Sequence, residues 1–328
     1  MKQFIHSFEE IISVDNLLEA WKEFVVDKKQ KEDVQEFSLS LIDNILLLRD
    51  DLFDLKYEHG GYEKFYISDP KPRTIHKASV RDRLVHHAIY RSLFLYFDKT
   101  FTSDSYSCRI NKGPYKAIDR FKSFFYKVSK NNHKTCWVLK CDIRKFFANI
   151  AHEILIKILN GRILDKNIMW LLEKVIQSFQ STKERVGLPL GNLTSQFFAN
   201  VYMNEFDQFM KHKIKAQYYI RYADDFIILS QDKMWLEDIL LKIKEFLKNN
   251  LKLELHPAKV SIETLASGID FLGWVNFADH RVLRTATKKR MIRRLDMNSS
   301  DATINSYLGL LGHCNGEKIR RKLNLLQS

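Results

Sequence analysis

The chain has 328 residues, so its length suggests about two domains, and with 45% hydrophobic and 12% aromatic residues it is too apolar to be disordered. Only 11 Gly and 5 Pro exclude a collagen-like or low-complexity chain, and aliphatic runs such as Ile45-Leu46-Leu47-Leu48 are far too short to span a bilayer. The net charge of +13 is uneven, because residues 281–328 carry 11 basic and 3 acidic residues whereas residues 1–50 carry 6 basic and 11 acidic ones.

The first hundred residues have helical and strand patterns in turn. Apolar residues at helical spacing predict two helices within 14–50, and aromatic residues over 57–67 favour a strand. A long amphipathic helix is expected over 80–98. Glu9 and Glu10 stand where a secretory signal would be apolar, so we expect an intracellular protein.

The middle of the chain alternates between strands and helices. We expect a short strand and loop over 105–114, a helix over 115–129, and a strand over 135–143 that ends in a carboxylate and is followed by a helix. Further helices are expected over 164–180 and 195–211. Two apolar runs over 218–229 flank Asp224-Asp225, which predicts a β-hairpin with the acids at its turn.

The last hundred residues close the pattern. A helix is expected over 234–249, strands over 251–255, 260–264 and 271–277, and helices in the basic segment 285–328. The strands cluster in the middle and the helices at both ends, so the fold class is α+β.

Three carboxylates carry the chemical signal. If the strand ending at Asp142 and the hairpin with Asp224-Asp225 are neighbours in one sheet, their carboxylates converge, and a cation must neutralise them. Hard oxygen ligands favour Mg²⁺ or Mn²⁺, and two such ions can activate a hydroxyl and stabilise a leaving pyrophosphate. That chemistry is nucleotidyl transfer. An Asp pair at a turn can also be a hairpin without any ligand, since Asp favours turns.

The surrounding residues resemble a known family. Tyr222-Ala223-Asp224-Asp225 between apolar strands resembles the catalytic box of reverse transcriptases. Other blocks resemble those of the prokaryotic, group II intron-like branch, in the correct order and over roughly 57–328; they are 73–85, 105–118, 142–150, 187–202, 268–274 and 308–315.

The block 187–202 narrows the resemblance. Most reverse transcriptases of this branch have Gln-Gly and then Ser-Pro there, whereas this chain has Leu190-Gly191 and Ser195-Gln196. That pattern resembles the enzymes of diversity-generating retroelements. They copy a template RNA with frequent errors at adenines, and the cDNA replaces part of a target gene.

The resemblance implies a role for each matched residue. Asp142 and Asp224 would be catalytic metal ligands with the Ile143 carbonyl, and Asp225 would be a weaker partner because adjacent strand residues point oppositely. Residues implied to bind the incoming nucleotide are Arg73, Arg81, Arg83, Phe146 as a steric gate, Leu190, Gly191 and Lys259. Those implied to contact primer or template are Tyr222, Ser195, Gln196, Gly273, Trp274, Lys288, Arg293 and Arg294.

Ordinary readings stand beside these roles. Phe146 and Leu190 could be core residues, the fingers arginines could hold template phosphate or pair with Asp82, and Lys259 could be merely solvated. Where most of the branch has a glutamine that could hydrogen-bond near the nascent base pair, Leu190 could offer only van der Waals contact.

The resemblance implies a right-hand polymerase fold: a helical extension at 1–56, fingers and palm at 57–280, and a basic helical thumb at 281–328. The expected function is Mg²⁺-dependent RNA-directed DNA synthesis, with Mn²⁺ as an alternative, on a template RNA with a DNA or RNA primer and dNTPs. A small basic accessory protein is an expected partner, a membrane is not, and the expected location is the cytoplasm of a bacterial or phage-infected cell. Alternatives are a retron or phage-defence enzyme and a catalytically idle RNA-binding scaffold.

Overall fold

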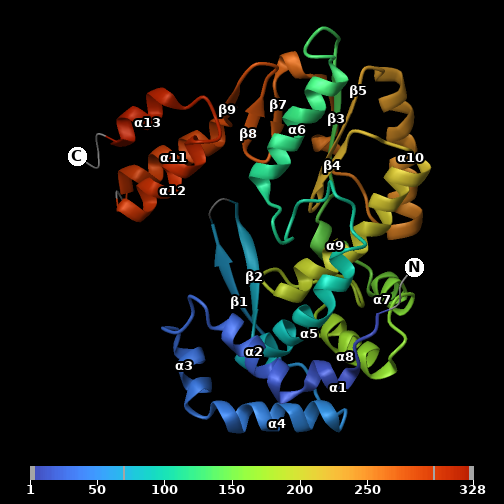
Figure 1. Ribbon diagram of the computed structural model, residues 1–328, viewed down its shortest axis with the longest axis vertical. Helices are drawn as coiled ribbons and strands as arrows, with labels where there is room; N and C mark the ends of the chain where they lie inside the picture. Colours follow the sequence, from blue (N-terminus) through green and yellow to red (C-terminus); the bar gives the residue numbers. More distant parts are fainter. Residues whose placement is uncertain (1–3, 69–70, 298–299, 325–328) are drawn as a thin grey trace. The chain divides into compact units, whose positions relative to one another are not determined.

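A computed structural model describes residues 4–68, 71–297 and 300–324 (Figure 1). The chain divides into two compact units. Unit 1 comprises Met1–Ser103, Ile143–Lys213 and Lys244–Glu254, and unit 2 comprises Asp104–Asp142, Ile214–Ile243 and Leu255–Ser328. Because both units are assembled from separated segments, neither follows the order of the sequence.

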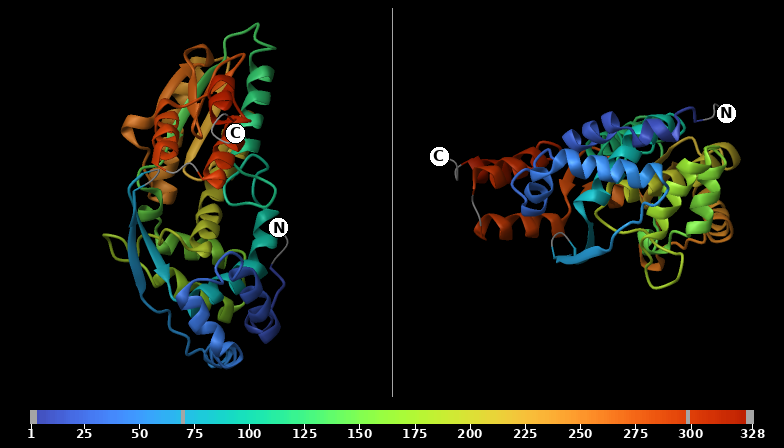
Figure 2. Two further views of the ribbon diagram at one scale, coloured as in Figure 1. Left: turned by 90° about the vertical axis from the view of Figure 1, so that its left-hand side faces the viewer. Right: turned by 90° about the horizontal axis from the view of Figure 1, so that it is seen from below.

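Unit 1 is mainly helical. Its N-terminal helices are α1 (Phe8–Ile12), α2 (Val14–Phe24), α3 (Glu32–Leu39) and α4 (Leu41–Phe53). The antiparallel strands β1 (Tyr62–Ile67) and β2 (Arg73–Ala78) form a hairpin that leads into α5 (Val80–Asp98) (Figure 2). The unit is completed by η1 (Phe146–Asn149), α7 (His152–Asn160), α8 (Lys166–Gln177), α9 (Leu193–Gln208) and the π-turn η2 (Phe209–Lys213).

Helix α5 is the centre of unit 1, because α2 and α9 both pack against it. It begins where the Ser79 side chain accepts a hydrogen bond from the Asp82 N–H, which satisfies one of the free donors of the first turn. One apolar face of the helix is buried from Val80 to Phe97, whereas Leu95 is exposed.

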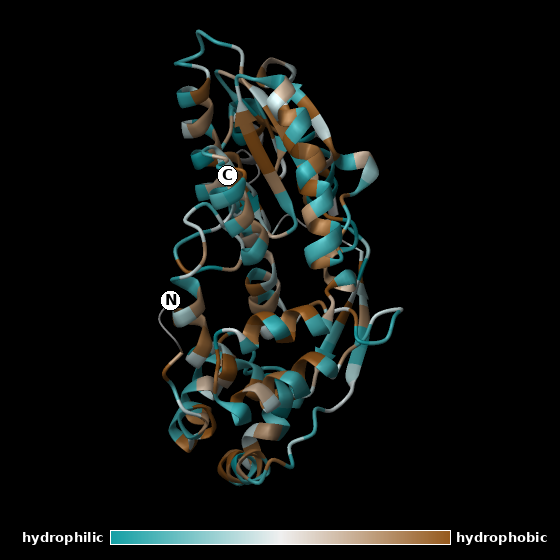
Figure 3. Ribbon diagram, turned by 90° about the vertical axis from the view of Figure 1, so that its right-hand side faces the viewer, coloured by the Kyte–Doolittle hydropathy of each residue, from teal (hydrophilic) through white to brown (hydrophobic). Residues whose placement is uncertain are grey.

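Unit 2 contains an antiparallel sheet in the order β4 (Tyr219–Tyr222), β5 (Asp225–Ser230), β3 (Trp137–Asp142) and β6 (Ser261–Thr264). Its central strand β5 has a run of buried apolar residues, and the hydropathy colouring of Figure 3 shows apolar strands in this sheet. Helix α6 (Pro114–Val128) packs on β4 and β5. Helix α10 (Lys233–Leu251) begins in unit 2 and ends in unit 1.

A second sheet of unit 2 joins β7 (Ile269–Phe271), β8 (Trp274–Asn276) and β9 (Arg281–Leu283) in antiparallel order. The helices α11 (Thr285–Met297), α12 (Asp301–Leu311) and α13 (Glu317–Asn324) follow and lie together (Figures 1 and 2). Within the described residues no helix is long and apolar enough to cross a membrane.

Most of the expected elements are confirmed, including the helix at 80–98 and the hairpin at 218–229. Five expectations are wrong. No regular strand forms over 105–114, where Ser105 makes only an isolated bridge to Arg221, and the strand expected over 271–277 is divided between β7 and β8 by a turn at Leu272 with φ of 52°. The segment 14–50 contains α2, α3 and the start of α4 rather than two helices, and the chain after β3 first forms a 3₁₀ turn. The expected strand at 251–255 is not formed, because α10 continues to Leu251 and Lys252 then adopts a left-handed conformation with φ of 51°.

Candidate active site

The two carboxylate-bearing segments are neighbours in the sheet of unit 2. Strands β3 and β5 pair antiparallel, and Asp142 at the end of β3 lies opposite Asp225 at the start of β5. Strand β4 ends with Tyr222, which pairs with Asp225, so Ala223 and Asp224 form the turn between them. Ala223 adopts a positive φ of 54°, which suits a tight hairpin turn. The expected convergence of the carboxylates is confirmed for Asp142 and Asp225.

The carboxylates of Asp142, Asp224 and Asp225 repel one another. Burial raises the pKa of Asp225 to about 7, and the charges of Asp224 and Asp142 add to this increase. The Asp225 side chain also hydrogen-bonds to Asp142. A proton on Asp225 or a bound cation therefore stabilises the group near neutral pH.

A lysine already supplies positive charge at this place. Lys259 Nζ lies 2.7 Å from Asp142 Oδ2, and Asp142 is buried while Lys259 is exposed. The backbone fixes the pair, because the His256 N–H donates to the Asp142 carbonyl at 2.8 Å and the Lys259 N–H donates to the His256 carbonyl at 3.0 Å.

The side chains at this place supply some, but not all, of the ligands that a divalent ion needs. In the part of the chain that the structure describes, no group of three or more carboxylate, imidazole or thiolate side chains is arranged to hold a metal. Mg²⁺ usually takes one or two carboxylates and completes its shell with water and substrate phosphates. Two hydrogen-bonded carboxyl groups, with a third at the adjacent turn and a lysine ammonium on one of them, fit that requirement.

Arg221 supports the turn and was missed in the sequence. Its side chain is fully buried in β4, and it donates to the Ala223 carbonyl at 3.0 Å and to Ser105 Oγ at 2.9 Å. A charged residue within the apolar run Tyr218–Leu229 was the available signal, since a buried charge needs fixed partners.

In unit 1 the residues expected to bind the nucleotide come from β2 and the loop before α9. The His76 N–H donates to the Leu190 carbonyl at 3.0 Å, and Asn192 Nδ2 donates to the His76 carbonyl at 2.9 Å. Gly191 has a φ of 103°, and a Cβ there would lie only 2.6 Å from Ile75 Cγ2. The loop therefore needs glycine to lie directly on the strand.

The three expected fingers arginines differ. Arg81 pairs with Asp51 at 2.7 Å and lies over the Tyr57 ring, and Arg83 pairs with Asp33 and lies over the Phe24 ring. Both side chains thus join α5 to the N-terminal helices. Arg73, at the start of β2, is exposed, which makes it the most accessible of the three to a phosphate.

The expected steric gate is buried in this structure. Phe146 is 3% exposed, opens η1 after the left-handed Lys145, and contacts the Phe147 ring at 5.3 Å between centroids. At the start of α9, Ser195 is buried and Gln196 is exposed. These roles stay predictions.

The expected primer and template residues of unit 2 also divide by exposure. Trp274 is buried against Tyr115, and Gly273, with φ of 95°, accepts a hydrogen bond from the Arg284 N–H. The three residues of α11 expected to contact primer or template are exposed, while Met291 and Leu295 on the same helix are buried; the three are Lys288, Arg293 and Arg294.

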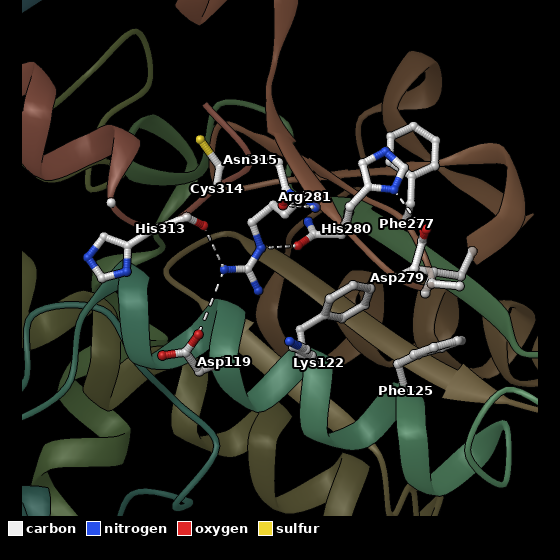
Figure 4. A pocket seen from close by; sticks show the side chains of 15 residues that line it. Asp119, Lys122, Phe125, Phe277, Asp279, His280, Arg281, His313, Cys314 and Asn315 are labelled. Carbon is white, nitrogen blue, oxygen red and sulfur yellow. Dashed lines mark hydrogen bonds and ion pairs between the residues drawn. The ribbon is translucent and has the colours of Figure 1, made fainter. Parts of the chain in front are cut away.

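A cavity of about 270 Å³ lies between the β8–β9 hairpin, α6 and the end of α12 (Figure 4). Arg281 crosses it and donates to Asn276 Oδ1 at 2.7 Å, to the His313 carbonyl at 3.2 Å and to the Ile118 carbonyl at 3.0 Å. The side chain therefore ties the C-terminal helices to the hairpin and to α6, a role that the sequence did not indicate.

Comparisons with known proteins identify the family. Residues 68–276 match the family model described as reverse transcriptase (RNA-dependent DNA polymerase). Protein YkfC of Escherichia coli strain K12 is 26% identical over 74% of this chain and 72% of its own length. The group II intron-encoded protein LtrA of Lactococcus lactis subsp. cremoris is 24% identical over 76% of this chain, and the match spans 52% of LtrA.

Two further matches cover comparable shares of this chain. The putative COX1/OXI3 intron 2 protein of Saccharomyces cerevisiae is 23% identical over 81% of this chain, which spans only 36% of the yeast protein. The structure of apo telomerase from Candida tropicalis has a TM-score of 0.52 at 14% identity, covering 74% of this chain and 60% of that one, and it shares the fold. With the family model matched over most of the chain, the protein belongs to the reverse transcriptases and is an RNA-directed DNA polymerase.

Proposed function

We propose that the chain is a right-hand polymerase whose palm carries the catalytic acids Asp142, Asp224 and Asp225. Residues 57–280 would form fingers and palm, 281–328 the thumb, and 1–56 a helical extension. The paired ends of β3 and β5, which place Asp142 opposite Asp225, carry this proposal.

Mg²⁺, or Mn²⁺ in its place, would be held by the carboxylates of Asp142, Asp224 and Asp225 and the Ile143 carbonyl. When bound it supplies activation of the primer hydroxyl and stabilisation of the leaving pyrophosphate. Arg221 fixes the turn that carries Asp224, and Lys259, which pairs with Asp142, would donate a proton to the leaving group.

Primer extension on an RNA template tests the catalytic assignment. Asp142→Asn and Asp224→Asn should each abolish extension, whereas the exposed helix substitution Asp238→Asn should leave it unchanged. Extension by either active-site variant at the wild-type rate would contradict the assignment. Binding without extension by the wild type would favour a catalytically idle scaffold.

The nucleotide would lie against the loop 187–192 and β2, with Phe146 rejecting a ribose 2′-OH and Arg73, Arg81 or Arg83 receiving its phosphates. Guanidinium groups offer bidentate contacts to phosphate oxygens. Primer and template would be contacted by other residues; these are Tyr222, Ser195, Gln196, Gly273, Trp274, Lys288, Arg293 and Arg294.

A mutagenic role in a diversity-generating retroelement is the finer proposal. Leu190-Gly191 and Ser195-Gln196 support it, because a leucine at position 190 offers no hydrogen bond near the nascent base pair. One hydrogen bond is worth about 0.5–1.5 kcal/mol, which accounts for at most about a tenfold change in error rate. The enzyme would then work in the cytoplasm of a bacterial or infected cell with a small basic accessory protein.

Sequencing of cDNA made on an adenine-containing RNA template tests this role. Leu190→Gln should lower misincorporation opposite adenine, and an identical error spectrum would contradict the role of Leu190. Near-identical DNA repeats that differ at adenines beside the gene would support the retroelement, and their absence would favour a retron or phage-defence enzyme.

A further inference from the structure

Helix α4 has more apolar surface than unit 1 covers. Ile45, Leu48 and Leu52 are buried against the rest of the unit. On an adjacent face, Ile42 and Phe53 are each 56% exposed and Leu46 is 44% exposed. Apolar residues that a helix leaves in water are ordinary when single, but a continuous face marks an interaction surface.

The exposed residues have the spacing of a helix-binding face. Positions 42, 46, 49 and 53 are separated by four, three and four residues, which places them on one stripe of an α-helix. The fourth member, Arg49, lies over the Phe53 ring at 4.8 Å, and its guanidinium pairs with Asp50. We call Ile42, Leu46 and Phe53 the α4 stripe.

Negative charge borders the α4 stripe. Residues 32–54 contain seven acidic residues and one basic residue. Some of these acids are neutralised within unit 1, since Asp33 and Asp51 pair with basic residues of β2 and α5. Asp43 and Asp50 are exposed on α4, one helical position beyond Ile42 and Arg49, and Asp50 pairs with its neighbour Arg49. A phosphate backbone or an anionic membrane is repelled by such a border.

We propose that the α4 stripe docks an amphipathic helix of a partner protein whose apolar face is bordered by lysine or arginine. The stripe supplies the apolar contacts, and Asp43 and Asp50 face the basic border of the partner, which sets orientation and association rate. The proposal rests on the basic partner suggested above, and its test does not depend on the error spectrum of the polymerase.

A designed peptide serves as the probe. A 28-residue helical peptide with Leu at the a and d positions and Lys at e and g presents the proposed chemistry, and a twin with Glu at e and g presents the opposite charge. Fluorescence anisotropy with the full chain should show at least tenfold tighter binding of the Lys peptide. Equal affinity, or preference for the Glu peptide, would overturn the proposal.

Two variants locate the binding. Ile42→Ser/Leu46→Ser/Phe53→Ser should weaken the Lys peptide at least tenfold, because it removes the apolar contacts. Asp43→Lys/Asp50→Lys should reverse the preference toward the Glu peptide, because only the border changes sign. Binding that both variants retain unaltered would place the peptide elsewhere and overturn the proposal.

A matched control separates the α4 stripe from exposed apolar surface in general. Met234 and Leu241 are 79% and 66% exposed on α10, and Met234→Ser/Leu241→Ser should leave peptide binding unchanged. Primer extension should be normal in all these variants, so that a failure of docking is distinguishable from a failure of the polymerase assignment.

Other occupants have their own outcomes. A wild-type dimer in sedimentation analysis that the triple serine variant converts to monomer would assign the stripe to a second copy and overturn the proposal. Binding to phosphatidylserine vesicles that the same variant abolishes would assign it to a membrane, with the same consequence.

Discussion

At the scale of single residues, the Lys259 ammonium competes with a divalent ion for the Asp142 carboxylate. An ammonium 2.7 Å from a carboxylate offers that carboxylate the same kind of neutralisation as a divalent ion. Lys259→Met should therefore tighten binding of Mn²⁺ in the absence of nucleotide, by about twofold to fivefold because the lysine is partly exposed.

Electron paramagnetic resonance of free Mn²⁺ measures that affinity directly. Lys242→Met, which removes an exposed lysine of α10, is the matched control and should leave the affinity unchanged. Equal Mn²⁺ affinity of wild type and Lys259→Met would show that the lysine does not compete.

His87 makes stability depend on pH. Burial lowers its pKa to about 4, and the charges of Lys28, Arg83 and Arg91 add to the shift, so the folded state keeps the ring neutral. The unfolded chain takes up a proton below about pH 6.5, so this stability is complete above that pH and is lost as the pH falls toward 4. At pH 5 the loss is at most about 2 kcal/mol.

Denaturant unfolding at pH 7.5 and pH 5 tests this dependence. The variant His87→Phe keeps a ring against Phe24 but does not titrate, so it should lose less stability than the wild type between the two pH values. Identical losses would assign the acid sensitivity to other groups, such as the fully buried His86, whose pKa is also lowered by burial.

The sequence alone pointed to the candidate catalytic acids, but it did not predict the long-range ion pairs of the expected nucleotide-binding arginines. Asp142 and Asp224-Asp225 stood out because carboxylates at strand ends are chemically conspicuous. The partners of Arg81 and Arg83 were not visible, because Asp51 and Asp33 lie 30 and 50 residues away along the chain. Exposure of an arginine is decided by tertiary packing, which residue type does not report.

At the scale of elements, the loop 187–192 depends on one glycine. Gly191→Ala places a Cβ 2.6 Å from Ile75 Cγ2 and also forces alanine to a φ of 103°. We expect the loop to move away from β2 and the free energy of unfolding to fall by about 1–3 kcal/mol. If this loop binds the nucleotide, the KM for dNTP should rise as well.

Thermal unfolding and steady-state kinetics check the glycine. Gly61→Ala is a suitable control, because a Cβ there has open space and the backbone needs no positive φ. A Gly191→Ala protein as stable as Gly61→Ala would show that β2 can move away from the added Cβ without lowering the free energy of unfolding.

Hydrophobic periodicity and turn residues predicted those helices and strands whose buried faces match the periodicity of their own sequence. Helix α5 has an apolar face along its full length, and Ser79 caps its N-terminal end. The strand expected at 251–255 failed because its alternating leucines, Leu251 and Leu253, are buried from a helix end and a loop rather than from a sheet. Periodicity over five residues does not separate these cases.

At the scale of the whole molecule, the uneven charge predicts how nucleic acid is held. The exposed Lys288, Arg293 and Arg294 of α11 would release counterions from template–primer phosphates. Changing all three to alanine should lower the slope of log Kd against log salt by about two to three.

Filter binding of a primer–template duplex at several salt concentrations measures the slope. The triple variant Lys242→Ala/Lys244→Ala/Lys248→Ala removes the same charge from exposed positions on α10 and should change the slope less. Equal slopes for the two variants would indicate a response to net charge rather than contact by α11.

The ion pair of Lys259 with Asp142 also bears on handling of the protein. Because Lys259 pairs with the buried Asp142, and Asp225 can hold a proton near neutral pH, we expect the fold to stay intact without an added ion. Prolonged chelation should then silence the polymerase without melting it, and restoring magnesium should return the full turnover. Metal depletion would therefore inhibit this enzyme reversibly, without unfolding it.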